Sequence, residues 1–169
     1  MNKNKKKSGF TLVEVIIVLA IIAVIAAIAI PNLTKVRTES KIKADTQSAE
    51  SIRKTMLMLI TEDKVMVNSS NTVLTLDFNE DTYKVDDILV GNNSLDTTND
   101  ANTILKNGTT ADDVVGYFEG IKKPQSDGSE TYKITIIRTG ATGNEEPGNV
   151  VVEVVGENGS ATSAGIIIK

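Results

Sequence analysis

The sequence contains no cysteine, no histidine and no tryptophan among its 169 residues. Their absence excludes a Ser-His-Asp triad, a cysteine nucleophile, a zinc site with the usual ligands and a disulfide framework. Carboxylates remain as candidate catalytic groups, but catalysis by a carboxylate pair needs two groups in different environments within a cleft. Adjacent acids on loops rich in Gly and Asn more often form a solvated surface. We therefore predict no enzyme, no catalytic residue and no cofactor.

Aromatic residues are also scarce, with three Phe and three Tyr in the whole chain. A surface that stacks nucleic-acid bases would have few side chains to work with. Residues 65–169 carry sixteen acidic and seven basic groups, a net charge of −9 that repels phosphate backbones. No nucleic-acid partner is expected.

Residues 10–30 are the most distinctive part of the chain, because 19 of these 21 residues are apolar. Twenty-one helical residues rise about 31 Å, which matches a hydrocarbon core of similar thickness. Residues 1–9, which precede this segment, carry four lysines and no acid. A lysine cluster beside an apolar helix stays in the cytoplasm. We expect a single-pass helix at 10–30, with the remaining chain outside the cytoplasmic membrane.

Two simpler interpretations of the apolar segment leave features unexplained. A secretory signal peptide has an apolar stretch of about 7–15 residues, shorter than this one. A plain membrane anchor accounts for the length but not for Gly9 or Glu14. A charged side chain deep in a bilayer costs on the order of 2.5–3.5 kcal/mol. Glu14 therefore needs a partner, and we expect none within the segment itself.

The run Lys-Ser-Gly-Phe-Thr-Leu-Val-Glu at residues 7–14 is followed by further apolar residues and Pro31. This pattern resembles a class III signal peptide, and the chain looks like a type IV prepilin over residues 1 to 60. The resemblance implies that residues 1–9 are a leader, which a prepilin peptidase removes by cutting between Gly9 and Phe10. It also implies N-methylation of Phe10 and an assembly role for Glu14, whose carboxylate would meet the Phe10 amine of a neighbouring copy.

The absence of cysteine separates this chain from Gram-negative members of the family, which usually have two C-terminal cysteines that bracket a receptor-binding loop. Pilins without cysteine and with a lysine-rich leader look more like those of Gram-positive, clostridia-like bacteria. Removal of residues 1–9 would change the formal net charge from −4 to −8, since the leader holds four lysines.

Residues 31–64 are predicted to continue the helix as an amphipathic segment. Glycine and proline are absent from residues 32–64, and apolar groups recur on one helical face at Ile42, Ala49, Ile52, Met56 and Leu59. Pro31 lacks an N–H and clashes with the preceding turn, so we expect a kink or local melting there. The resemblance favours melting, because pilin helices can melt near this proline within filaments.

The acidic remainder falls into a mixed region at 65–131 and a β-sheet region at 132–169. In the mixed region we predict a short strand at 73–76, a short helix at 100–106 and a capped helical turn beginning at Thr110. β-branched runs at 132–138, 149–155 and 165–169, separated by Gly-rich turns, predict three strands of an antiparallel meander. The expected fold is α+β, the type IV pilin fold, with one long helix packed on an antiparallel sheet.

The acidic run that starts at Asp77 and includes Asp81 is a candidate metal site. It imitates the start of a calcium loop, which requires Gly at the sixth position and Glu at the twelfth. Thr82 and Ile88 occupy those positions, so the pattern fails. No metal site is predicted, with Asp77 and Asp81 kept as the alternative.

The sequence thus indicates a structural subunit of a type IV pilus. The resemblance implies three partners: further copies in a helical homopolymer, the prepilin peptidase, and assembly machinery in the cytoplasmic membrane. The precursor would span that membrane with its N-terminus in the cytoplasm, and the mature chain would form an extracellular filament for adhesion, surface motility or biofilm formation. Two alternatives stay open: a pseudopilin of a type II secretion-like or competence system, and a membrane-anchored adhesin monomer.

Overall fold

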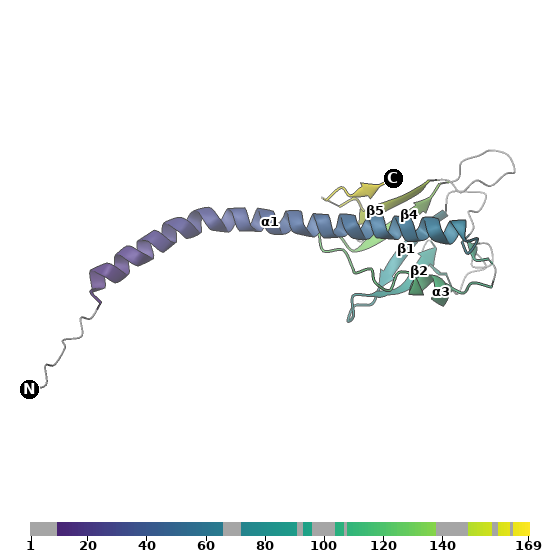
Figure 1. The fold of residues 1–169 in the computed structure, drawn as a ribbon, viewed down its shortest axis with the longest axis horizontal. Coiled ribbons are helices and arrows are strands. Elements are labelled where there is room, and N and C mark those ends of the chain that lie inside the picture. Colours follow the sequence, from purple (N-terminus) through teal and green to yellow (C-terminus); the bar gives the residue numbers. More distant parts are fainter. Residues whose placement is uncertain are drawn as a thin grey trace, which may run out of the picture. The chain divides into compact units, whose positions relative to one another are not determined.

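The computed structural model describes residues 10–65, 72–90, 93–95, 104–106, 108–137, 149–156, 159–162 and 164–169. The chain divides into two compact units, Met1–Glu39 and Ser40–Lys169. The first unit holds the N-terminal part of helix α1, and the second holds the rest of α1 and a sheet (Figure 1). Each unit is described separately below.

Helix α1 extends over Leu12–Thr61 and passes through Pro31 without interruption. The helical assignment of the isolated chain is continuous at this proline, and the melting that the resemblance implies for packed filaments stays a prediction. Proline has no N–H to donate to the carbonyl of Ala27, so the helix lacks one backbone hydrogen bond there. One turn later, the Thr34 hydroxyl donates to the Pro31 carbonyl over 2.8 Å. The flanking turns thus hold the helix together across the proline.

The end of α1 is set by Asp63, whose φ of 55° lies in the left-handed region. The Lys64 N–H donates to the Leu59 carbonyl over 2.9 Å, and the Asp63 N–H donates to the Ile60 carbonyl over 3.1 Å. This pair of bonds is the Schellman arrangement, here with Asp in the position that glycine usually takes. It satisfies carbonyls that the last helical turn would otherwise leave unpaired.

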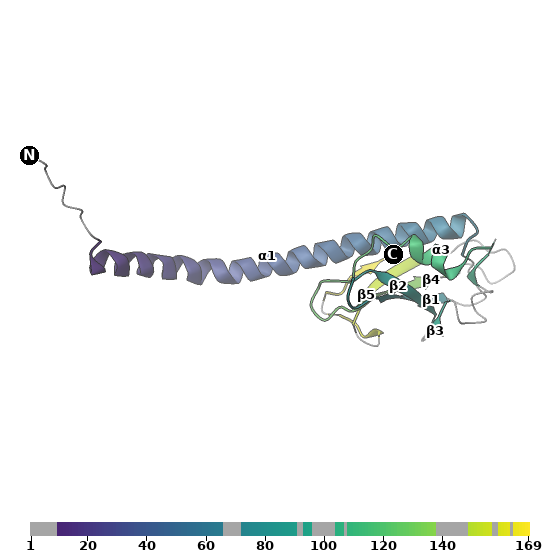
Figure 2. The same cartoon turned by 90° about the horizontal axis from the view of Figure 1, so that it is seen from below.

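The second unit contains one six-stranded antiparallel sheet in the order β3-β2-β1-β4-β5-β6. Its strands are β1 (Thr72–Phe78), β2 (Val85–Val90), β3 (Asn93–Ser94), β4 (Thr131–Ile136), β5 (Val150–Val155) and β6 (Ile167–Ile168). Figure 2 shows the sheet as a layer along the second half of α1. The helix-on-sheet α+β fold predicted from the sequence is therefore confirmed.

The core lies between α1 and the inner face of the sheet. Ala49, Ile52, Met56 and Leu59, four of the five predicted stripe residues, are fully buried on the helix. Alternate residues of the strands face them, because successive side chains of a strand point to opposite faces. The largest fully buried side chains of the second unit are Tyr132, Phe118, Ile52, Met56, Leu59, Leu74, Leu76, Ile88, Leu95, Ile134, Ile136 and Val114.

The predicted meander is confirmed, since β4 pairs with β5 and β5 with β6, all antiparallel. The single short strand predicted at 73–76 is longer, as β1, and belongs to the same sheet. Two strands of the mixed region, β2 and β3, were not predicted. Adjacent Asp86 and Asp87 interrupt the apolar alternation of β2, and Asp77 and Asp87 even lie opposite each other across the β1–β2 pair.

The helical turn predicted at Thr110 is present as α3 (Ala111–Gly116). Thr110 and Asp113 form a reciprocal capping box, in which the Thr110 N–H and hydroxyl donate to the Asp113 carboxylate over 2.8 and 2.7 Å. The short helix predicted at 100–106 lies mostly outside the described residues. Within its last part, Leu105 forms a β-bridge with Val65.

Truncation of the buried stripe should destabilise the second unit. We expect Leu59→Ala to lower the free energy of unfolding by about 2–5 kcal/mol, since it removes a fully buried side chain and leaves a cavity. Lys54→Ala, at an exposed position of the same helix, should change it by less than about 0.5 kcal/mol. Urea unfolding of the full chain in detergent micelles measures both. Equal effects would contradict the helix–sheet core.

The capping box predicts the titration of Asp113. The backbone N–H and then the hydroxyl of Thr110 hold the pKa of this carboxyl below its ordinary value. A lowered pKa stabilises the fold above the unfolded-state pKa, and this stabilisation is lost as pH falls through the folded-state pKa. Carboxyl NMR titration should show the Asp113 pKa rising toward its ordinary value in Thr110→Val but not in Thr109→Val. The rise should be partial, because the backbone N–H at position 110 remains, and an unchanged pKa in Thr110→Val would refute the hydroxyl bond to the carboxylate.

Candidate functional site

The first turn of α1 holds Glu14 in a capping box with Thr11. The Thr11 N–H and the Thr11 hydroxyl each donate to Oε2 of Glu14 over 2.8 Å. In return, the Glu14 N–H donates to the Thr11 hydroxyl oxygen over 3.3 Å. This is the reciprocal arrangement that a Thr-x-x-Glu sequence forms at a helix N-terminus.

The expectation that the apolar segment offers Glu14 no partner is therefore wrong with respect to hydrogen bonding. Thr11 supplies two donors to the carboxylate, and the positive end of the helix dipole lies at the same turn. Both donors are neutral groups, however, so they leave the negative charge of the carboxylate uncompensated. Among the described residues, no lysine or arginine forms an ion pair with Glu14. An acceptor for a further cation is thus presented at the start of the helix.

The surface around Glu14 is apolar on every side of the helix. Val13, Ile17 and Leu19 are 62%, 54% and 60% exposed, and the exposed apolar residues continue to Ile30. A soluble helix would bury one such face, whereas a helix that is apolar all round packs against lipid or other apolar helices. This part of α1 is also long and apolar enough to cross a membrane.

The remaining predicted processing and assembly residues lie along the same unit. Phe10 is 82% exposed and immediately precedes the capping residue Thr11. Pro31 lies inside α1, more than four turns from Glu14. Gly9 and the leader at 1–9 lie outside the described residues. The structure therefore places Phe10 beside the capping box, while Pro31 is distant from it.

Asp77 and Asp81, the alternative metal ligands, are engaged in local hydrogen bonds around the β1–β2 turn. Oδ1 of Asp77 accepts from the Phe78 N–H over 3.1 Å, and the Asp81 N–H donates to Oδ1 of Asn79 over 3.1 Å. Within the described part of the chain, His, Cys, Asp and Glu side chains nowhere converge in a group of three or more that could hold a metal ion.

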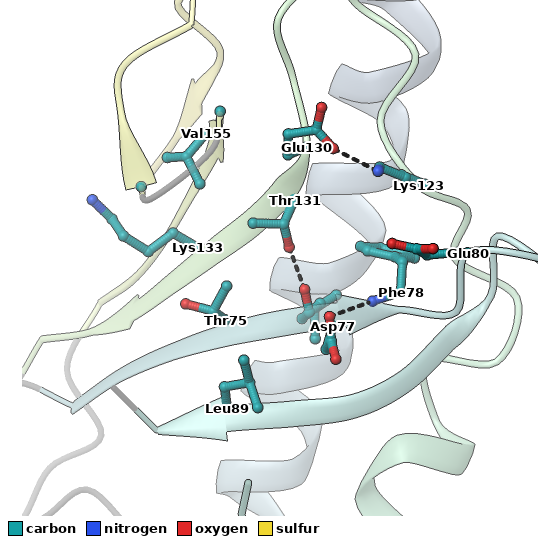
Figure 3. A pocket seen from close by; sticks show the side chains of 13 residues that line it. Thr75, Asp77, Phe78, Glu80, Leu89, Lys123, Glu130, Thr131, Lys133 and Val155 are labelled. Atoms are coloured by element: carbon teal, nitrogen blue, oxygen red, sulfur yellow. Dashed lines mark hydrogen bonds and ion pairs between the residues drawn. The ribbon is translucent and has the colours of Figure 1, made fainter. Parts of the chain in front are cut away.

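A hollow of about 570 Å³ lies on the sheet face that points away from α1 (Figure 3). It opens where β1 and β4 separate, beyond the last paired residues Thr75 and Lys133. There the Thr131 hydroxyl donates to the Leu76 carbonyl. Lys123 and Glu130 form an ion pair of 2.5 Å at its rim, and this pairing raises the Lys123 pKa. Asp77, Glu80 and Lys133 also line the hollow.

Asp45 is the buried polar residue that the sequence interpretation missed. It is 2% exposed, and its two carboxylate oxygens accept from the Gln125 and Ser126 N–H groups, each over 2.8 Å. The signal was present in the sequence, because Asp45 lies three residues after Ile42 and four before Ala49, on the predicted apolar stripe. An acid on such a stripe indicates buried hydrogen-bond donors in the facing segment.

Comparison with known proteins finds matches at the N-terminal end of the chain. Residues 4–30 match a family model described as the prokaryotic N-terminal methylation motif. A relative from Clostridium perfringens (strain 13 / Type A), named prepilin peptidase-dependent protein A, is 36% identical over 73 residues. That alignment covers 43% of this chain and 52% of the relative, so the chain spans about half the length of the curated relative it matches. No solved structure matches the chain.

The methylation motif occupies the segment in which Glu14 is capped and the helix is apolar all round. The name of the clostridial relative describes that protein as dependent on a prepilin peptidase. Together with the helix-on-sheet fold, these similarities support a type IV pilin-like protein.

Proposed function

We propose that this chain is a structural subunit of a type IV pilus, made as a membrane-spanning precursor and polymerised outside the cell. The observation that carries the proposal is the first unit: an all-round apolar helix with a capped carboxylate, within a prokaryotic methylation motif. Water disfavours the apolar surface and lipid disfavours the carboxylate of Glu14, whereas a bundle of copies can bury the apolar surface and supply a cation for the carboxylate. Dependence on a prepilin peptidase is supported by the motif and by the clostridial relative.

In the precursor, residues 10–30 span the membrane and the leader at 1–9 stays in the cytoplasm. The four leader lysines favour this orientation. The capping box lowers the cost of Glu14 in the bilayer, because two donors already satisfy its carboxylate. Cleavage between Gly9 and Phe10 then removes the lysines and creates an α-amine, which is methylated on Phe10.

Assembly uses the charge that the capping box leaves uncompensated. The amine of Phe10 from one copy pairs with Glu14 of the next, since a cation beside a buried carboxylate repays part of its desolvation cost. Thr11 holds the Glu14 side chain against the helix start, immediately beside Phe10, so the carboxylate is placed before the partner arrives. A head-to-tail contact of this kind does not close on itself and generates a helical fibre.

This contact between copies determines where the other parts of the chain lie in the proposed filament. The apolar part of α1 forms the filament core, residues 31–64 join it to the sheet, and the acidic surface of 65–169 faces outward. Pro31 is the place where the helix can melt when copies pack closely, because the Ala27 carbonyl already lacks a backbone donor. Adhesion, surface motility or biofilm formation are the roles that such a fibre would serve, with the membrane assembly machinery as a further partner.

Analysis of sheared surface material from the producing cells tests the proposal directly. We expect long fibres by electron microscopy, composed mainly of this chain, and a mature N-terminus at N-methylated Phe10 by mass spectrometry. An intact Met1 start or a cut after Ala29 would refute the pilin function. Processed chains that remain in the membrane without long fibres would favour a pseudopilin or an anchored adhesin instead.

The assembly role of Glu14 predicts that processing and polymerisation can be separated. Glu14→Ala should be cleaved normally, while filament yield falls at least about tenfold, since loss of a buried ion pair costs about 3–5 kcal/mol. Glu39→Ala, an exposed acid outside the apolar segment, is the matched control and should assemble normally. Immunoblots of cell-bound and sheared fractions measure both steps. Normal filaments from Glu14→Ala would exclude the proposed pairing.

A further inference from the structure

The buried stripe of α1 has a seven-residue repeat that leaves its position along the sheet ambiguous. The stripe residues are Ile42, Asp45, Ala49, Ile52, Met56 and Leu59, at alternating spacings of three and four. Such spacing forms a heptad seam, and a shift of seven residues, about 10.5 Å, superimposes one half of the seam on the other. Apolar contacts are non-directional, so by themselves they discriminate poorly between two such registers.

Asp45 is the one polar member of this seam, and a shift of the helix by seven residues would not preserve its contacts. Its carboxylate is buried and accepts the N–H groups of Gln125 and Ser126, both from the segment that precedes β4. The Ser126 hydroxyl shares a further buried hydrogen bond of 2.7 Å with that of Ser129. A seven-residue shift that moves Asp45 to the present place of Ile52 would bury its carboxylate among apolar side chains, and it would bring Thr38, which has no carboxylate, to the two N–H donors. Unpaired buried groups of this kind are strongly unfavourable.

The other directional contacts of α1 with the sheet unit are weaker markers of position. Lys41 pairs with Asp127 over 2.9 Å, but both side chains are largely exposed, and exposed ion pairs contribute little. The Arg53 side chain donates to the Val150 carbonyl over 3.1 Å. The Lys41 and Arg53 contacts both form with α1 in the position that Asp45 sets.

We propose that Asp45 fixes the axial register of α1 on the sheet, as a buried polar residue fixes the register of a coiled coil. The segment at 125–129 holds it in place, because the consecutive backbone N–H groups of Gln125 and Ser126 donate to the two oxygens of one carboxylate at that height along the helix. This role concerns which helix residues face the sheet and does not depend on the proposed pilus function.

Replacement by leucine separates a register role from simple stabilisation. Asp45→Leu completes the apolar seam, and replacing buried charged groups by apolar ones is often neutral or stabilising. We therefore expect the Leu variant to fold with a cooperative unfolding transition but to populate more than one register. If Asp45 only added stability, the Leu variant would keep a single register whatever its unfolding free energy.

Cysteine cross-linking of the full chain in detergent micelles measures the register, because the natural sequence has no cysteine. Arg53→Cys with Asn149→Cys reports the observed register, since these two side chains meet at 3.5 Å. Thr46→Cys with Asn149→Cys reports the register shifted by seven residues. A short bismaleimide should join only the first pair when Asp45 is present. In Asp45→Leu, the yield of the second pair should rise at least about tenfold, the factor for about 1.4 kcal/mol.

Two further variants make the test decisive. Ile52→Val weakens the apolar packing of the seam but keeps Asp45. In this variant only the Arg53→Cys/Asn149→Cys pair should cross-link. Asp45→Asn replaces one accepting oxygen with a donor and should give an intermediate yield at the Thr46 position. Should Asp45→Leu fail to fold, Asp45→Asn decides the question. Cross-linking through Arg53→Cys alone in the folded Leu or Asn variant would overturn the proposal.

Discussion

The contact between one stripe of α1 and the inner face of the sheet is the interaction on which the second unit depends. The chain has no disulfide to restrain its strands, so burial and strand pairing supply the cohesion. Ile52, Met56 and Leu59 from the helix meet side chains from the central strands β1 and β4, such as Leu74 and Ile134. The sheet buries its apolar face against this helix, and residues outside the strands, such as Val114 and Phe118, complete the same core.

The N-terminal part of the same helix has different surroundings, because no described strand covers its apolar residues. There the apolar residues are exposed on all sides, and the single acid, Glu14, is held by the Thr11 cap. Two capping boxes within the described residues illustrate the contrast. Thr110 and Asp113 start a short helix at the surface, where the carboxylate is solvated. Thr11 and Glu14 start an apolar helix, where the same arrangement offsets the loss of water.

Local patterns predicted much of this architecture. The apolar run and the amphipathic stripe identified α1, and β-branched runs bounded by glycine identified β4, β5 and β6. The residues of the candidate site were predicted from the resemblance of residues 7–14 to a class III signal peptide. The prediction failed where tertiary contacts decide the outcome. β2 carries the adjacent acids Asp86 and Asp87, which hide its strand character, and it forms because β1 offers it a partner.

The missed role of Asp45 has the same origin. Nothing local shows that the backbone of Gln125 and Ser126, eighty residues away in sequence, will face this carboxylate. Thr-x-x-Glu at residues 11–14 is a capping pattern. In apolar surroundings, however, the charge of Glu14 indicated a partner from a neighbouring copy and not a hydrogen bond within its own helix. Long-range pairing of β1 with β4 was likewise invisible, because strand patterns indicate faces and not neighbours.

The place of β1 between β2 and β4 has a consequence for the order in which the chain is made. Val73 pairs with Thr135, so the centre of the sheet closes only after the later strand has left the ribosome. Until then the stripe around Ile52 and Met56 has been synthesised but has no sheet to cover it. An exposed apolar stripe on a nascent chain invites aggregation. For a chain already engaged with a bilayer, the membrane surface is the nearest apolar phase that can shelter it.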